Sequence, residues 1–373
     1  MKTLRALLAT TVAAATLAPA ISPTPAWAQT IRERQWYLQT LDVPAAHRIS
    51  TGAGVIVAVL DSGVGKHPDL DGQVIDGISY APGTGTSLTD NHGHGSSIAG
   101  VIAAKGGTSD HLLGIAPEAK ILSVRTGTGS PALGKTNIPD GIRYAVDHGA
   151  TVINISEGGK LERGGPEAVQ YALEHDVVIV AGSGNMSQFQ PGSGVIQPAA
   201  FPGVIAVSAT DRAGKVWDGA IGGPEVVLTA PGVDIPTVCA EGGGRTAGYN
   251  LTGNGTSIST AIVSGAAALI RASHPGMTAN DVIQRLISTA DDAGPPGRDR
   301  DYGYGRLNLV QSLTADVPAV ASNPLQPART SPAAESGRQL VSDGRLALLA
   351  SGGCLIALLA GTGVFVLRRR RSR

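Results

Sequence analysis

Three short segments of the chain carry side chains that together can perform nucleophilic catalysis. Asp61 follows the apolar run VIVAVL, His94 opens the segment HGSSIAG, and Ser257 lies in GNGTSISTA, in that order along the chain. A serine hydroxyl is a weak nucleophile until a histidine accepts its proton, and that histidine needs a carboxylate to hold its tautomer. The chain supplies all three residue types, so the combination predicts covalent catalysis by a serine.

Each of these residues also has an ordinary structural explanation. Asp61 could cap a turn, His94 could be a structural hydrogen-bonding histidine, and Ser257 could be the N-cap of a helix. Each explanation is reasonable by itself, but a coincidence of all three is much less so. The amides at a helix start near Ser257 would also favour negative charge developing on a substrate.

The elements that must position these residues alternate between short apolar runs and helical stretches from residue 48 to residue 313. This alternation predicts an α/β domain in which a mainly parallel sheet lies between layers of helices. In such sheets functional residues follow the carboxyl ends of strands, as Asp61 does and as Asn185 does after VVIVAGSG. The predicted strands span residues 55–60, 121–124, 151–155, 177–180 and 204–209, and the main predicted helices span residues 139–148, 166–175, 259–273 and 280–290.

Composition excludes several classes of protein. The 29 basic and 29 acidic residues lack the basic excess of a nucleic-acid-binding protein. Cys239 and Cys354 are too few for a disulfide-rich scaffold or a four-cysteine zinc site. His92 and His94 form an H-x-H pair, but no third ligand clusters nearby, so we predict no metal site.

The two ends of the chain indicate export and membrane anchoring. Residues 1–28 have the basic start, apolar stretch and Ala26-Trp27-Ala28 cleavage site of a signal peptide. Residues 29–47 form an N-terminal extension, and residues 314–345 a Pro/Ala/Ser-rich linker. Residues 346–367 carry no charge and predict a transmembrane helix, and the arginine-rich residues 368–373 predict a cytoplasmic tail. The domain before the linker is therefore expected outside the cell membrane.

The segments AVLDSGV, HGSSIAG and GTSISTAIVSG resemble the three signature motifs of subtilisin-like serine proteases. The resemblance covers residues 48–313 and includes the closing stretch DYGYGRLN. It implies a subtilisin-like fold in which Asp61 orients the base, His94 is the general base and acid, and Ser257 is the nucleophile. It also implies that the Asn185 side chain and the Ser257 main-chain N–H stabilise the oxyanion.

The same resemblance implies where a substrate binds, and it shows where this chain departs from the family. Ala261 replaces a usual proline, Ser97 a usual histidine, and Glu157 a usual apolar residue. Glu157 could favour Lys or Arg in the substrate, or it could point to solvent. No calcium loop is readable, although many relatives bind calcium; we predict no cofactor and leave a structural calcium open. The implied substrate-binding segments are Ser156, Glu157, Gly158 and Gly159, and Ala181, Gly182, Ser183 and Gly184.

The short extension, Pro-rich linker and single membrane helix resemble the actinobacterial mycosins, which are membrane-anchored proteases associated with type VII secretion. The extra loop cysteines common in mycosins are missing here. The resemblance implies a single-pass membrane protein that cleaves exported polypeptides and has membrane components of a secretion system as partners.

Two alternative functions lack the motifs that they require, and a third stays open. An α/β-hydrolase carries its triad in the order Ser, acid, His, and its serine lies inside a G-x-S-x-G turn. This chain has neither feature around Ser257. A dinucleotide-binding module needs a G-x-G-x-x-G after the first strand, which is also missing. A subtilisin-shaped scaffold that stabilises a membrane secretion complex, with little or no proteolysis, stays open. Such a scaffold would be free to lose its triad, so the competent residues at those positions favour an active protease.

Overall fold

The computed structural model describes residues 29–81, 85–127, 137–161, 164–190 and 192–327. The predicted signal peptide, transmembrane helix and basic tail lie outside these residues, as does most of the linker. Within the described part of the chain, none of the helices has the length and apolar character needed to cross a membrane.

A parallel sheet runs through the domain in the order β2–β3–β1–β4–β5–β6–β7. Its central strands are buried on both faces, which explains their nearly continuous apolar sequences. All five predicted strands are present with ends shifted by no more than two residues. The strands are β1 (Ile56–Asp61), β2 (Val74–Ser79), β3 (Lys120–Arg125), β4 (Val152–Ile155), β5 (Val178–Gly182), β6 (Ile205–Thr210) and β7 (Leu228–Pro231).

Two strands of this sheet were missed from the sequence. Strand β2 lies at the edge, is only half-buried, and has an irregular register between Asp76 and Ile78, so its apolar signal is weak. Strand β7 has only four residues and ends in Pro231. Both are edge strands, but β7 is fully buried, so its short length rather than its exposure explains why its pattern is unclear.

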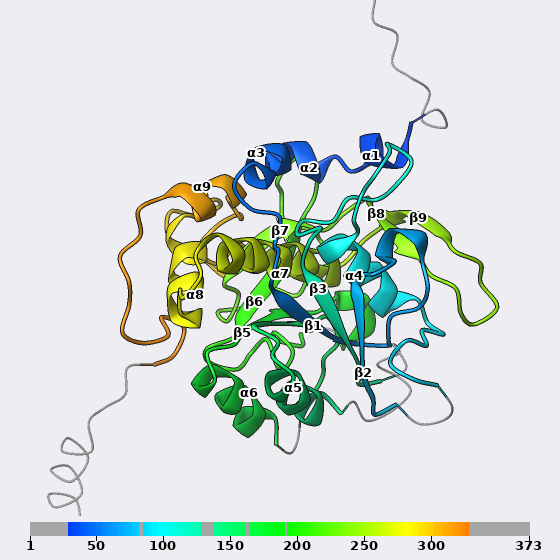
Figure 1. Cartoon of the computed structure of the whole chain (residues 1–373). Coiled ribbons are helices and arrows are strands. Elements are labelled where there is room, and N and C mark those ends of the chain that lie inside the picture. The colour runs from blue at the N-terminus through cyan, green and yellow to red at the C-terminus, as the bar shows by residue number, and fades with distance from the viewer. Residues whose placement is uncertain (1–28, 82–84, 128–136, 162–163, 191, 328–373) are drawn as a thin grey trace, which may run out of the picture. The chain divides into compact units, whose positions relative to one another are not determined.

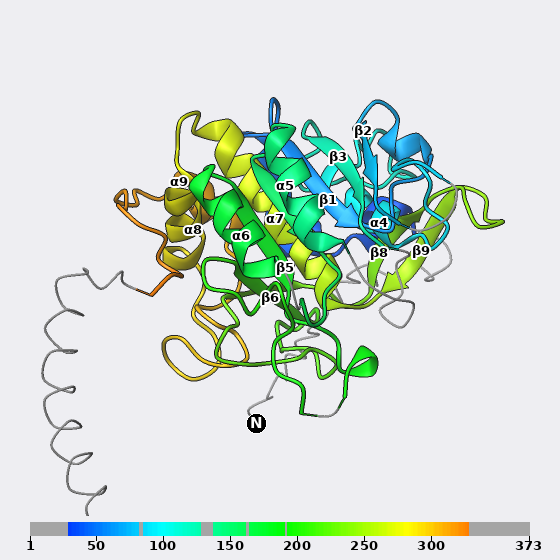
Figure 2. The same ribbon diagram turned by 90° about the horizontal axis from the view of Figure 1, so that it is seen from below.

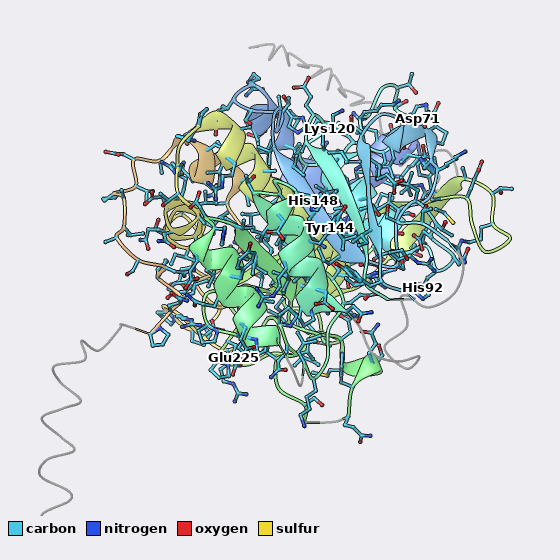
Figure 3. The ribbon with its side chains drawn as sticks, turned by 60° about the horizontal axis from the view of Figure 1, so that its bottom comes forward. Asp71, His92, Lys120, Tyr144, His148 and Glu225 are labelled. Carbon is cyan, nitrogen blue, oxygen red and sulfur yellow. The ribbon has the colours of Figure 1, made fainter. Side chains whose placement is uncertain are left out.

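Helices cover both faces of the sheet, as predicted. On one face lie α4 (His94–Ala103), α7 (Thr256–Ser273) and α8 (Ala279–Ser288). On the other, α5 (Ile138–Asp147) and α6 (Gly165–Glu174) lie side by side over the strands (Figures 1 and 2). The rings of Tyr144 and His148 stack with their centres 3.7 Å apart at the C-terminal end of α5 (Figure 3). Because α7 is buried along nearly its whole length, it forms the centre of the core.

Shorter elements complete the domain. Helices α1 (Ile31–Arg34), α2 (Tyr37–Thr40) and α3 (Val43–His47) form a row across the domain, from α1 near β8 to α3 beside α9 (Leu309–Thr314) (Figure 1). Tyr37 and Val43 are fully buried. The N-terminal extension is therefore packed on the domain. A 3-10 turn, η2 (Pro68–Leu70), packs beside α4, and a second one, η4 (Met186–Gln188), follows β5. An antiparallel hairpin of β8 (Ile235–Cys239) and β9 (Gly248–Gly253) also packs against α4.

Candidate active site

Asp61 and His94 form a direct hydrogen-bonded pair at the carboxyl end of β1. Asp61 is the last residue of that strand and is fully buried, and His94 is the first residue of α4. His94 Nδ1 lies 2.8 Å from Asp61 Oδ1 and 2.9 Å from Oδ2. Burial lowers the pKa of His94, but the charge and hydrogen bond of Asp61 outweigh it and raise the pKa to about 9. The imidazole is thus oriented by a carboxylate and stabilised in its protonated form.

A second buried carboxylate, Asp90, holds the segment before His94. Its Oδ1 accepts hydrogen bonds from the Ser62 hydroxyl and from the main-chain N–H of Gly93, and its Oδ2 accepts two from Ser96. The Arg245 guanidinium, from the loop between β8 and β9, donates to the main-chain oxygen of Asp90. Neither residue was predicted from the sequence. Asp90 was readable as an acid four residues before His94, but Arg245 is 155 residues away along the chain and carries no local signal.

Ser257 lies in the first turn of α7, next to the end of β4. Gly255 is the N-cap of this helix and no side chain caps it, so the alternative that Ser257 is an N-cap is wrong. The Ser257 hydroxyl donates to the main-chain oxygen of Ser156 at 3.1 Å, and no hydrogen bond joins it to His94 among the described residues. Ser156 Oγ donates in return to the Ser257 carbonyl at 3.1 Å. Since β4 pairs with β1, these contacts place Ser257 beside the strand that ends in Asp61.

Asn185 is oriented by the same turn of α7. It follows β5, and its Oδ1 accepts hydrogen bonds from both the main-chain N–H and the hydroxyl of Thr256, each at 3.0 Å. This leaves Nδ2 as the donating end, here 3.3 Å from Gln188 Oε1. A buried amide fixed in this way can donate to developing negative charge without reorganising. Thr256 is a further positioning residue that the sequence analysis missed.

The two segments implied to bind substrate differ in exposure. Residues Ser156, Glu157, Gly158 and Gly159 are half-buried, whereas Ala181, Gly182, Ser183 and Gly184 are buried. Ala181 and Gly182 belong to β5 and pair with β4 and β6, so their main-chain groups are used by the sheet. Gly159 pairs with Gln197 through two main-chain hydrogen bonds of 3.0 and 3.1 Å. Residues 156–159 are therefore more accessible to a substrate than residues 181–184.

Glu157 does not point into solvent. Its Oε2 accepts a 3.5 Å hydrogen bond from the Thr126 hydroxyl, and its Oε1 is buried. Burial and, next, the charge of Asp61 raise the pKa of Glu157 to about 8. A carboxyl is thus held next to the triad in a partly protonated state near neutral pH.

The described residues near the triad form no metal site, and Ser97 and Ala261, which depart from the family pattern, have structural contacts. No group of three or more His, Cys, Asp or Glu that could hold a metal gathers among the described residues. The rings of His92 and His94 have centres 6.2 Å apart, and His92 is exposed on the loop before α4 (Figure 3). Ser97 donates to Gly93 and to Val238, which ties α4 to β8. Ala261 is fully buried in α7.

The comparisons with known proteins agree with this fold. Residues 52–305 match the model of the subtilase family, Peptidase S8, so the chain belongs to the subtilase family and is a subtilisin-like serine protease. It is 34% identical over 279 residues to a thermostable alkaline protease of Halalkalibacterium halodurans, an alignment that covers 73% of this chain and 72% of that protein.

Among solved structures, the chain is similar to mycosins. MycP1 of Mycobacterium smegmatis superposes with a TM-score of 0.68 and 28% identity, over 82% of this chain and 91% of that one. A chain of the intact ESX-5 inner membrane complex superposes with a TM-score of 0.67 and 29% identity, over 87% and 90%. The family prediction is therefore confirmed, and the mycosins are structural neighbours of this protein.

Proposed function

We propose that this protein is a membrane-anchored serine endopeptidase that cleaves exported polypeptides outside the membrane and works with a type VII secretion system. The observation that carries the catalytic part is the 2.8 Å contact between Asp61 and His94 beside a serine at the start of a buried helix. The similarity to the mycosins supports the association with secretion. The apolar residues 346–367 support a single-pass anchor with a cytoplasmic C-terminus.

The proposed mechanism assigns one task to each side chain. The Ser257 hydroxyl turns from the Ser156 oxygen toward His94 Nε2, loses its proton to that nitrogen, and attacks the substrate carbonyl. The Asn185 Nδ2–H and the Ser257 N–H hold the oxyanion of the tetrahedral intermediate. His94 then returns the proton to the leaving amine, which leaves an acyl-enzyme on Ser257. Water activated by His94 hydrolyses the ester and restores the serine.

This function is tested by treating the purified full-length protein with a serine-directed fluorophosphonate and locating the adduct by peptide mass spectrometry. We expect labelling at Ser257 that is lost in Ser257→Ala and His94→Ala. A folded protein that shows no labelling, and no cleavage of any peptide in a diverse library, would contradict the proposal.

A second candidate function is a structural role in a membrane secretion complex. It is favoured by the similarity to a chain within the intact ESX-5 inner membrane complex. The two functions are separated by replacing the native gene with one encoding Ser257→Ala. Loss of cleavage with normal secretion and normal complex assembly would support the structural role, and loss of secretion with an assembled complex would support proteolysis.

A further inference from the structure

The Glu157 carboxyl is an unsatisfied acidic group next to the triad. Its single hydrogen bond, from the Thr126 hydroxyl to Oε2, is long at 3.5 Å. None of the described residues donates a hydrogen bond to Oε1, although that atom is buried. Buried polar groups are nearly always paired, and an exception in a native structure requires an explanation.

The position of this carboxyl relates it directly to the reacting groups. Thr126 follows β3, and its main-chain N–H donates to the Asp61 carbonyl at 2.9 Å. Ser156, which precedes Glu157, accepts the hydrogen bond of the Ser257 hydroxyl. Strands β3, β1 and β4 are neighbours in the sheet, so Glu157 lies over their carboxyl ends beside both the acid and the nucleophile.

The charges around Glu157 are mostly negative. Asp61 on β1 and Asp90 before α4 both disfavour its ionised form, and the protonated form of His94 on α4 is the cation that favours it. Arg125 on β3 makes no ion pair with Glu157 among the described residues. The Arg125 guanidinium instead lies beside Gly85, on the loop before Asp90. Its Nη1 is 2.8 Å from the position that a Cβ on Gly85 would occupy. Among the described residues, the carboxyl thus has one long hydrogen bond and no ion pair with a permanently charged side chain.

We propose that Glu157 is a specificity-determining residue that binds a Lys or Arg side chain of the polypeptide substrate. An ammonium offers three N–H donors and a guanidinium five, so either can pair with the Glu157 carboxyl and supply the positive charge that its surroundings lack. The inference rests on the proposed proteolytic function and deepens it by naming the substrate class. A purely structural Glu157 would need a partner for Oε1 within the chain, and the described residues provide none.

Recognition of a cation by this carboxyl depends on pH in a defined direction. Burial and the Asp61 charge raise the pKa of Glu157 to about 8, so the group is largely neutral below that pH and ionised above it. Binding a cationic side chain below pH 8 therefore requires loss of the carboxyl proton. The preference for Lys and Arg should increase as the pH rises through this range.

The experiment compares cleavage of a diverse peptide library by the full-length wild type, Glu157→Gln and Glu174→Gln. Glu174 is exposed at the end of α6 and serves as the matched control for loss of one carboxylate. We expect one position near the cleaved bond to favour Lys and Arg over glutamine and norleucine. In E157Q this ratio of kcat/KM should fall by about tenfold to a hundredfold, the range of a charge-assisted hydrogen bond. E174Q should retain the wild-type ratio.

Further measurements separate failure of this inference from failure of the proposed function. Fluorophosphonate labelling of Ser257 in E157Q that reaches the wild-type rate on the plateau above about pH 9, where His94 is neutral in both proteins, would show that the site is intact. The charge-reversed variant Glu157→Lys should prefer Asp or Glu at the same position, and the pH dependence of the ratio should vanish in E157Q. An active wild type without a Lys or Arg preference, or an unchanged ratio in E157Q, would overturn the inference alone. Absence of both labelling and cleavage in the wild type would overturn the proposed function and this inference with it.

Discussion

Two regions of the molecule contain a fully buried aspartate hydrogen-bonded to Nδ1 of a partly exposed histidine. One is the pair of Asp61 and His94, 2.8 Å apart, and the other is the pair of Asp69 and His111, 2.5 Å apart. The histidine side chains are 28% and 41% exposed. By distance and burial alone, the two pairs would be hard to tell apart.

The surroundings of the two pairs differ. Asp61 ends a central strand, beside the Ser156–Ser257 contact and the first turn of α7. Asp69 lies in the 3-10 turn η2, and its second oxygen is saturated by the Leu112 N–H and the Tyr249 hydroxyl, each at 2.8 Å. Asp69 therefore joins η2, a loop and β9. An Asp–His pair becomes a candidate catalytic pair only where the sheet places a nucleophile and oxyanion donors beside it.

The largest expected effect comes from removing the charge of the first aspartate. Asp61→Asn should lower the rate of fluorophosphonate labelling at Ser257 by about 10⁴-fold, because His94 loses the partner that holds its tautomer. The equivalent change in the second region, Asp69→Asn, should alter that rate by no more than about threefold, because it touches none of the reacting groups. Equal losses in both variants, measured as labelling rate per folded molecule, would abolish the distinction between the regions.

Removal of the oxyanion donor Asn185 should cause the second-largest loss of activity. Asn185→Ala should reduce kcat on a peptide substrate by about 10²- to 10³-fold, because the Nδ2 donor is lost while Asp61, His94 and Ser257 stay in place. KM should change little, since the interaction strengthens only in the transition state. Steady-state kinetics measure both quantities, and a loss confined to KM would show that Asn185 binds the ground state instead.

The pH dependence of the first region should follow His94. Because the pKa of this group is raised to about 9, the imidazole is mainly protonated at neutral pH and can accept the Ser257 proton only in its minor neutral form. Labelling should therefore increase by about tenfold per pH unit up to about pH 9 and then level off. In Glu157→Gln the midpoint should move to lower pH, since Glu157 contributes to raising the His94 pKa. A flat profile between pH 7 and pH 9 would contradict this assignment.

The second region should matter for stability. Asp69→Asn should lower the free energy of unfolding by about 1–3 kcal/mol, because the buried contacts to His111 and Tyr249 lose their charged acceptor. Asp71→Asn is the matched control, since Asp71 is exposed two residues further along (Figure 3). Thermal or urea unfolding monitored by circular dichroism compares the two. Similar stabilities for both variants would mean that the Asp69 cluster does not hold the fold together.

Much of the fold was predictable from local pattern. The apolar, β-branched runs that became β1, β3, β4, β5 and β6 are buried on both faces, so their sequences carry a strong signal. The half-buried edge strand β2 has a weak pattern and was missed. The helix that carries Ser257 begins at Thr256, three residues before the predicted start, because the N-cap is a glycine rather than a recognisable capping side chain.

The candidate site, like the fold, has features that the local sequence predicts and features that it does not. The sequence by itself determined which residue types are available, their order, and their places after strands or at helix starts, because these depend on neighbours along the chain. Only the tertiary structure decided that Arg245 reaches the Asp90 loop, that Thr256 orients Asn185, and that Glu157 is buried beside Asp61 instead of facing solvent. It also decided that one Asp–His pair lies near the Ser156–Ser257 contact, while the aspartate of the other pair accepts a hydrogen bond from Tyr249. Such contacts join segments far apart in the chain, and burial and hydrogen-bond pairing across the folded core select them, so no local pattern records them.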